Sequence, residues 1–146
     1  MIERLTLPML LEICRAGNFE ATIQDNCVDL LLDHGRMASL VLNELGNKIS
    51  FCFVPNIEVK MDDRDDLMLV NAINAAFVDD DELPSFTSCI DCYDEDTEED
   101  ALLIRCAETL DGGVSEKQIT CFLKACSMAV DKVFAIINGD VDGNNE

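Results

Sequence analysis

The sequence contains no tryptophan, one tyrosine, one histidine and three prolines among its 146 residues. Cations are also scarce: 10 Lys and Arg stand against 30 Asp and Glu, so the formal net charge is −20. Because phosphates and anionic lipid headgroups bind Lys and Arg, this shortage argues against a nucleic-acid partner and against a membrane surface. The scarcity of aromatic residues also removes the stacking platforms on which single-stranded nucleic acids bind.

Several sequence signals are absent as well. No apolar run approaches the roughly 20 residues of a membrane-spanning helix, and residues 1–5 lack the basic-then-apolar form of a signal peptide. The motifs GxGxxG, GxxxxGK[ST], GxSxG and HExxH do not occur, which removes the common phosphate-binding and hydrolytic signatures. We therefore expect a cytoplasmic protein that is not an enzyme and requires no cofactor.

The hydrophobic content is 49%, which is too high for a disordered chain. A chain of this length suits one domain. We expect a single α+β domain over residues 1–138, followed by a polar tail at residues 139–146.

Three segments have helical spacing of apolar residues. The first begins after the candidate N-cap Thr6 and ends at Gly17. The second begins near Asp62, because four aspartates cluster there and the positive N-terminal end of a helix dipole favours negative side chains. The third follows a Ser-x-x-Gln capping box that starts at Ser115.

Six segments alternate apolar and polar residues, or are short apolar runs between turns, as strands do. The order α-β-β-β-β-α-β-β-α predicts an antiparallel sheet of five or six strands, with three helices packed mainly on one face. The expected core includes Leu30, Phe51, Phe53, Ile73, Ile104, Phe122, Val130 and Phe134.

Eight cysteines lie mostly within apolar patterns, which indicates reduced thiols in the core. Cys89 and Cys92 form a CxxC pair, but zinc needs four ligands, and redox CxxC pairs open a helix. Residues three apart on a strand point to opposite faces, so these thiols should diverge. A cysteine-dependent redox or metal-binding protein that uses this pair remains the alternative function.

Eleven carboxylates and no cation lie between Asp79 and Asp100. We interpret this block as solvated charge that keeps the protein soluble. Loose cation binding by the loop at residues 94–100 stays open, as does steering of a basic partner. A weaker hypothesis is an acidic mimic that occupies a basic, nucleic-acid-binding protein.

Apolar residues also occupy strand positions that point away from the expected core. They are Leu31, Met37, Val41, Cys52 and Val54. If helices cover one face only, these residues form an apolar patch, which is typical of an interface. We predict a homodimer that binds a protein or peptide partner, and a basic partner is one candidate. We expect Val41→Glu or Val54→Glu to split the dimer; the alternative is a monomer whose first helix covers this face.

Asn71 and Asn74 lie within the apolar pattern of the second helix. Asn is a poor helix former, and a buried amide needs partners. These amides either fix the helix to a neighbouring strand or make polar contacts in a helix-mediated interface.

Short segments carry a family resemblance. They are Asp25-Asn26-Cys27, Asn71-Ala72-Ile73-Asn74-Ala75, Leu102–Leu110, Gly113-Val114-Ser115 and the last helix with Phe122 and Phe134. Together they resemble the YbjN family of small bacterial proteins, provisionally named sensory-transduction regulators and similar in fold to type III secretion chaperones. The resemblance implies a noncatalytic regulator or chaperone-like module, and it offers no catalytic residues. The acidic hairpin loop departs from the family pattern.

Overall fold

The computed structural model describes residues 1–78, 83–84, 86–94 and 99–139, without the side chains of residues 92–94. Its elements follow the predicted order, with one short 3-10 turn, η1, added. They are α1 (Leu7–Ala16), β1 (Glu20–Gln24), β2 (Cys27–Leu31), η1 (Asp33–Gly35), β3 (Met37–Leu42), β4 (Lys48–Phe53), α2 (Arg64–Val78), β5 (Thr87–Asp94), β6 (Glu99–Thr109) and α3 (Glu116–Ile137). Residues 140–146 of the expected polar tail lie outside the described part of the chain.

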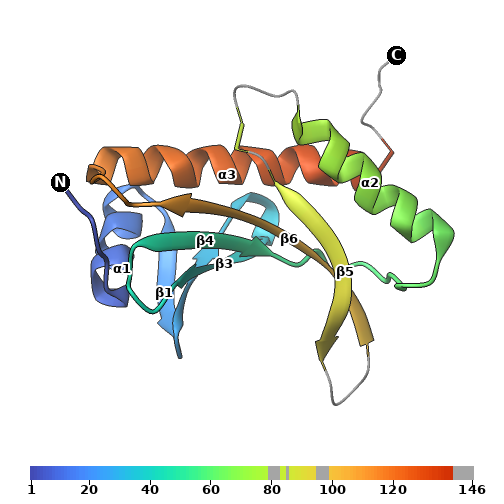
Figure 1. The fold of residues 1–146 in the computed structure, drawn as a ribbon, viewed down its shortest axis with the longest axis horizontal. Helices are drawn as coiled ribbons and strands as arrows, with labels where there is room; N and C mark the ends of the chain where they lie inside the picture. The colour runs from blue at the N-terminus through green and yellow to red at the C-terminus, as the bar shows by residue number, and fades with distance from the viewer. Residues whose placement is uncertain (79–82, 85, 95–98, 140–146) are drawn as a thin grey trace.

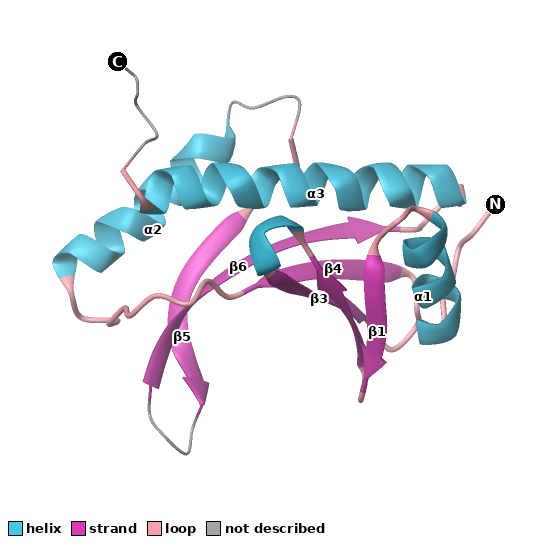
Figure 2. Ribbon diagram, turned by 180° about the vertical axis from the view of Figure 1, so that it is seen from behind, coloured by secondary structure: helices cyan, strands magenta, loops and turns pink. Residues whose placement is uncertain are grey.

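The strands form one six-stranded sheet in the order β1-β2-β3-β4-β6-β5, and every neighbouring pair is antiparallel. The predicted α+β class is therefore confirmed, with six strands and three helices. Figure 1 shows α3 running along one side of the twisted sheet, with α1 and α2 towards its two ends. Seen from behind, the three helices again lie on this side of the strands (Figure 2).

Side-chain caps set where the helices begin. Thr6 Oγ1 accepts a hydrogen bond from the Met9 N–H at 3.3 Å, as the sequence predicts. The Ser115–Gln118 capping box is also present, with bonds of 2.7 and 3.1 Å. The expected start of α2 near Asp62 is wrong by two residues. Asp63 Oδ1 accepts from the Asp65 and Asp66 N–H groups at 2.9 and 3.2 Å, so the helix begins after Asp63.

The core lies between the sheet and the helices. Phe51 and Phe86 pack with ring centroids 5.8 Å apart, and Phe77 lies 5.3 Å from Phe86. Of the expected core residues, Phe122 and Phe134 are corrected to partly buried. Phe134 lies at the rim, where the guanidinium of Arg36 covers its ring at 3.7 Å. The other six are buried: Leu30, Phe51, Phe53, Ile73, Ile104 and Val130.

Candidate functional site

The side of the sheet away from the three helices is the open face. None of the described helices lies on it (Figures 1 and 2). Leu31, Met37, Val41 and Val54 remain 37–49% exposed there, and Cys52 is half-buried. The alternative in which the first helix covers this face is therefore wrong, because α1 lies on the same side as α3 and contacts it.

One line of apolar side chains crosses the open face. Leu31 pairs with Met37 between β2 and β3, and Leu103 pairs with Cys89 between β6 and β5. The β3–β4 register, continued two residues beyond Ser39 and Cys52, brings Met37 opposite Val54. These residues form the apolar row: Leu31, Met37, Val54, Leu103 and Cys89. Sequence reasoning missed Leu103, although the alternation along β6 places it on the face opposite Leu102 and Ile104.

A polar row runs beside the apolar row. Asp29 pairs with Ser39 across β2 and β3, and Cys52 pairs with Arg105 across β4 and β6. Asp29 Oδ1 accepts hydrogen bonds from Ser39 Oγ at 3.0 Å and from Cys27 Sγ at 3.5 Å. Val41 lies beyond this row, opposite Cys27 and Ser50. The predicted patch is thus a narrow stripe, with Val41 separated from it.

At the Leu31 end of the apolar row, next to β1, lies a cleft of about 450 Å³. Phe19, Leu31 and Met37 line it together with the carboxylates of Glu20 and Asp29. Arg15 also lines the cleft, and it donates a hydrogen bond through Nη2 to the Ala21 carbonyl oxygen at 3.2 Å. An apolar wall beside two carboxylates suits a side chain with an aliphatic stem and a positive end, such as Lys or Arg.

The two asparagines of α2 have different environments. Asn74 Nδ2 donates to the Ser88 carbonyl oxygen at 3.2 Å, and Asn74 Oδ1 accepts from the Ser88 N–H at 2.6 Å. Ser88 Oγ lies 3.1 Å from Asn74 Oδ1 and 3.2 Å from the Val70 carbonyl oxygen. Asn74 therefore fixes α2 to β5. Asn71 is exposed on the outer side of the helix.

The described thiols are free. Cys14, Cys106 and Cys126 are buried; burial raises the pKa of Cys14 to about 11 and also raises the pKa of Cys126. Cys89 is exposed on β5, and the side chain of Cys92 lies outside the described residues, so the use of this pair stays a prediction. Within the described residues, no three His, Cys, Asp or Glu side chains group closely enough to hold a metal ion.

Seven of the eleven carboxylates of the acidic block lie at residues 79–82 and 95–98, outside the described residues. Of its described members, Asp100 accepts a hydrogen bond through Oδ2 from the Met61 N–H at 2.8 Å. Cation binding by residues 94–100 therefore remains a prediction. His34, the single histidine, lies exposed in the turn between β2 and β3.

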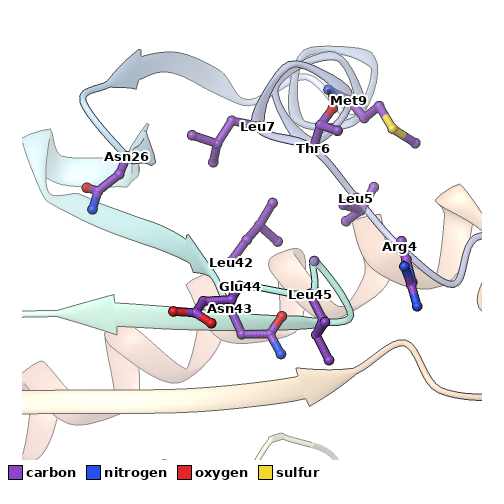
Figure 3. Close-up of a pocket in the computed structure, with 11 residues that line it drawn as sticks. Arg4, Leu5, Thr6, Leu7, Met9, Asn26, Leu42, Asn43, Glu44 and Leu45 are labelled. Atoms are coloured by element: carbon purple, nitrogen blue, oxygen red, sulfur yellow. Dashed lines mark hydrogen bonds between the residues drawn. The ribbon is translucent and has the colours of Figure 1, made fainter.

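A cleft of about 570 Å³ lies between the segment before α1 and the β3–β4 turn (Figure 3). Leu5, Leu7 and Leu42 form much of its apolar lining, with Arg4 and Glu44 on different sides. The lining contains no histidine or cysteine that could act as a nucleophile or base. This cleft therefore indicates no catalytic chemistry of the Cys–His type.

No family model matches the chain, and no curated protein matches it. Three chains of solved structures match it by fold. One is YbjN from E. coli, provisionally described as a transcription regulator, with a TM-score of 0.71 and 18% sequence identity. The match covers 92% of this chain and 93% of YbjN, so the two share a fold over nearly their full lengths. No helix in the described residues is long and apolar enough to cross a bilayer.

Proposed function

We propose that the chain is a noncatalytic regulator or chaperone-like module that acts as a homodimer and binds a protein or peptide partner through the apolar row. The observation that carries this proposal is the exposure of Leu31, Met37 and Val54 on the helix-free face of the sheet, where Leu31 pairs with Met37. The fold match to YbjN, a protein provisionally described as a regulator, agrees with a binding role.

The apolar row has the dimensions of a binding stripe. It crosses five strands, and neighbouring strands lie about 4.8 Å apart, so it is roughly 20 Å long. Covering such a row removes apolar surface from water, which favours association. The hydrogen-bonded polar row alongside it supplies the rim that specific interfaces have.

The charge of the chain favours a basic partner. At a net charge of −20 the chain attracts cationic proteins over long range and repels acidic ones. Glu20 and Asp29 at the end of the apolar row place two carboxylates beside the cleft. A partner segment with apolar residues next to a Lys or Arg fits both features.

Partner capture with a matched pair of variants tests the role of the row. Leu31 and Ile23 are each 39% exposed, but they lie on opposite faces of neighbouring strands. We expect Leu31→Glu to lose the proteins that the wild type enriches from source-cell extract, and Ile23→Glu to retain them. Thermal unfolding confirms that both variants are folded. If folded Leu31→Glu retains the same proteins, the binding role of the row is wrong.

Light scattering at several protein concentrations tests the homodimer. We expect a mass near twice the 16.2 kDa of the chain in moderate salt. If the mass stays at the monomer value up to a protein concentration on the order of 100 μM, the homodimer part of the proposal is wrong.

A further inference from the structure

A small cleft lies under the N-terminal half of α3, on the covered side of the sheet. Its volume is about 340 Å³. Figure 1 shows this half of α3 running along the start of β4 and the end of β6. We call it the α3 cleft, and most of its lining is formed by Ile49, Glu108, Leu110, Ile119, Cys121 and Phe122. It is separate from the apolar row, which lies on the open face.

Most of the lining of the α3 cleft is apolar. Ile49, Leu110 and Ile119 are core residues that are at most 3% exposed. Val114 and Phe122 also line the cleft and are partly buried against the same core. Small-molecule sites have such apolar walls, and their volumes begin at about 300 Å³. The α3 cleft is therefore large enough for the apolar body of a small ligand.

Glu108 occupies a core-facing position of β6. It pairs with the buried Ile49 across β4 and β6, so both side chains point to the covered side of the sheet. Ile104 and Cys106, which precede it on the same side of the strand, are buried. Glu108 itself is exposed, and no ion pair involves it within the described part of the chain. A carboxylate at a core position beside an apolar cleft is typical of a polar group that orients a ligand.

The walls of the α3 cleft are held in place by contacts within the chain. Val114 exchanges two backbone hydrogen bonds with Ile2, at 2.6 and 2.8 Å, and the Leu110 N–H donates to the Asn47 carbonyl oxygen at 2.8 Å. Gln118, which also lines the cleft, is held by the capping box of α3. Because these walls are fixed before binding, a ligand avoids the cost of ordering them.

We propose that the α3 cleft binds a small organic cation, with its apolar body against the core residues and its ammonium group beside Glu108. Among the described residues that line the cleft there is one carboxylate and no Lys, Arg or His, so the charge of the site favours a cation over an acid. In the cleft at the Leu31 end of the apolar row, by contrast, Arg15 accompanies Glu20. This inference does not rest on the homodimer or on the apolar row.

Three ligands of nearly equal shape test the charge preference of the α3 cleft. They are phenethylamine, 2-phenylethanol and phenylacetate. We expect phenethylamine to bind with a Kd on the order of 1 mM or below, as good ligands of this size do. The other two should bind at least about 5-fold more weakly, because they lack the ammonium group that contacts the carboxylate. Titration of the wild type, followed by NMR chemical shifts, measures the three affinities.

Charge variants locate the bound amine. Glu108→Gln keeps the size of the side chain and removes its charge, so phenethylamine should bind at least about 5-fold more weakly. Glu108→Lys should reverse the preference, so that phenylacetate binds more tightly than phenethylamine. Glu20→Gln is the matched control, because it neutralises a carboxylate of the other cleft, and it should leave the affinity unchanged. Thermal unfolding checks that each variant is folded.

Alkylation of Cys121 provides a readout that needs no variant. Its exposed thiol lines the α3 cleft, whereas Cys89 is exposed on β5. Saturating phenethylamine should slow the reaction of Cys121 with iodoacetamide at least about 3-fold, because the bound ligand blocks access to the thiol. The reaction of Cys89 should be unchanged. Mass spectrometry of the digested protein measures both rates.

Each contrary result overturns the inference. Phenethylamine that does not bind at about 10 mM, or that binds no more tightly than phenylacetate, would contradict the proposed ligand class. If Glu20→Gln weakens binding and Glu108→Gln does not, the amine binds at the end of the apolar row. If Nα-acetyl-lysine amide binds as tightly as phenethylamine, the cleft accepts a lysine side chain of a protein, and the assignment to a small molecule is wrong. Unprotected Cys121 would place the amine outside the α3 cleft.

Discussion

The covered and open faces of the sheet come from the same strands, one residue out of phase. In β4, Ile49, Phe51 and Phe53 are at most 3% exposed, while Val54, the next residue, is 37% exposed. The covered face carries interlocking aromatic rings that exclude water. The open face carries an apolar row beside a hydrogen-bonded polar row. Alternation along a strand thus separates residues that hold the fold together from residues that are available for recognition.

The largest expected effect is on the covered face. Phe51→Ala removes a fully buried ring and leaves a cavity, so we expect the free energy of unfolding to fall by about 3–5 kcal/mol. Val54→Ala on the open face should cost less than about 1 kcal/mol. Urea denaturation measures both. Equal losses would show that Val54 belongs to the core and would remove the contrast between the faces.

High pH should lower the free energy of unfolding through the buried thiol of Cys14. Burial raises the pKa of Cys14 from 9.0 to about 11, so the unfolded chain releases this proton at lower pH than the folded chain. The contribution of this thiol to the free energy of unfolding is therefore fully present below pH 9. As the pH rises to 11, the free energy of unfolding falls by roughly 2–3 kcal/mol because of this thiol. Denaturation of Cys14→Ala should show a smaller decrease over the same range. If the free energy of unfolding falls with pH equally steeply in the variant and the wild type, Cys14 is not the cause of the decrease.

The two asparagines of α2 give a matched contrast on one helix. Asn74→Ala leaves the Ser88 N–H without its acceptor in a partly buried site, so we expect a loss of about 1–3 kcal/mol. Asn71→Ala should stay within about 0.5 kcal/mol when the chain is monomeric, because its side chain is exposed. Thermal unfolding at low protein concentration measures the difference. The prediction fails if both variants lose the same stability.

The smallest effect is expected in the polar row of the open face. Ser39→Ala removes the 3.0 Å hydrogen bond that Ser39 donates to Asp29. Because this bond is only partly buried, the free energy of unfolding should fall by about 0.5 kcal/mol. Because the apolar row is untouched, partner capture should persist. A fold that collapses on this change would mean that the open face also supports stability.

Local patterns were sufficient to predict the element order, the Thr6 cap, the Ser115 capping box and the α+β class. Each of these features depends on residues within a few positions of one another, where spacing and capping chemistry act directly. The same alternation placed Leu31, Met37 and Val54 on the outward side of their strands. The start of α2 was misplaced because several neighbouring aspartates could cap it, and only the folded chain selects Asp63.

Contacts between residues distant in the sequence decided the rest. β6 lies between β4 and β5, and the β4–β6 register, continued one residue beyond Phe53 and Ile104, brings Leu103 opposite Val54. Ser88 reaches Asn74 but not Asn71, and Arg36 from the β2–β3 turn covers Phe134 of α3. Periodicity in the sequence shows that a side chain faces outward, but strand register and helix docking determine which outward side chains meet. The sequence alone therefore specified the α+β class and the outward residues of the strands, whereas the tertiary structure decided which of them form the apolar row.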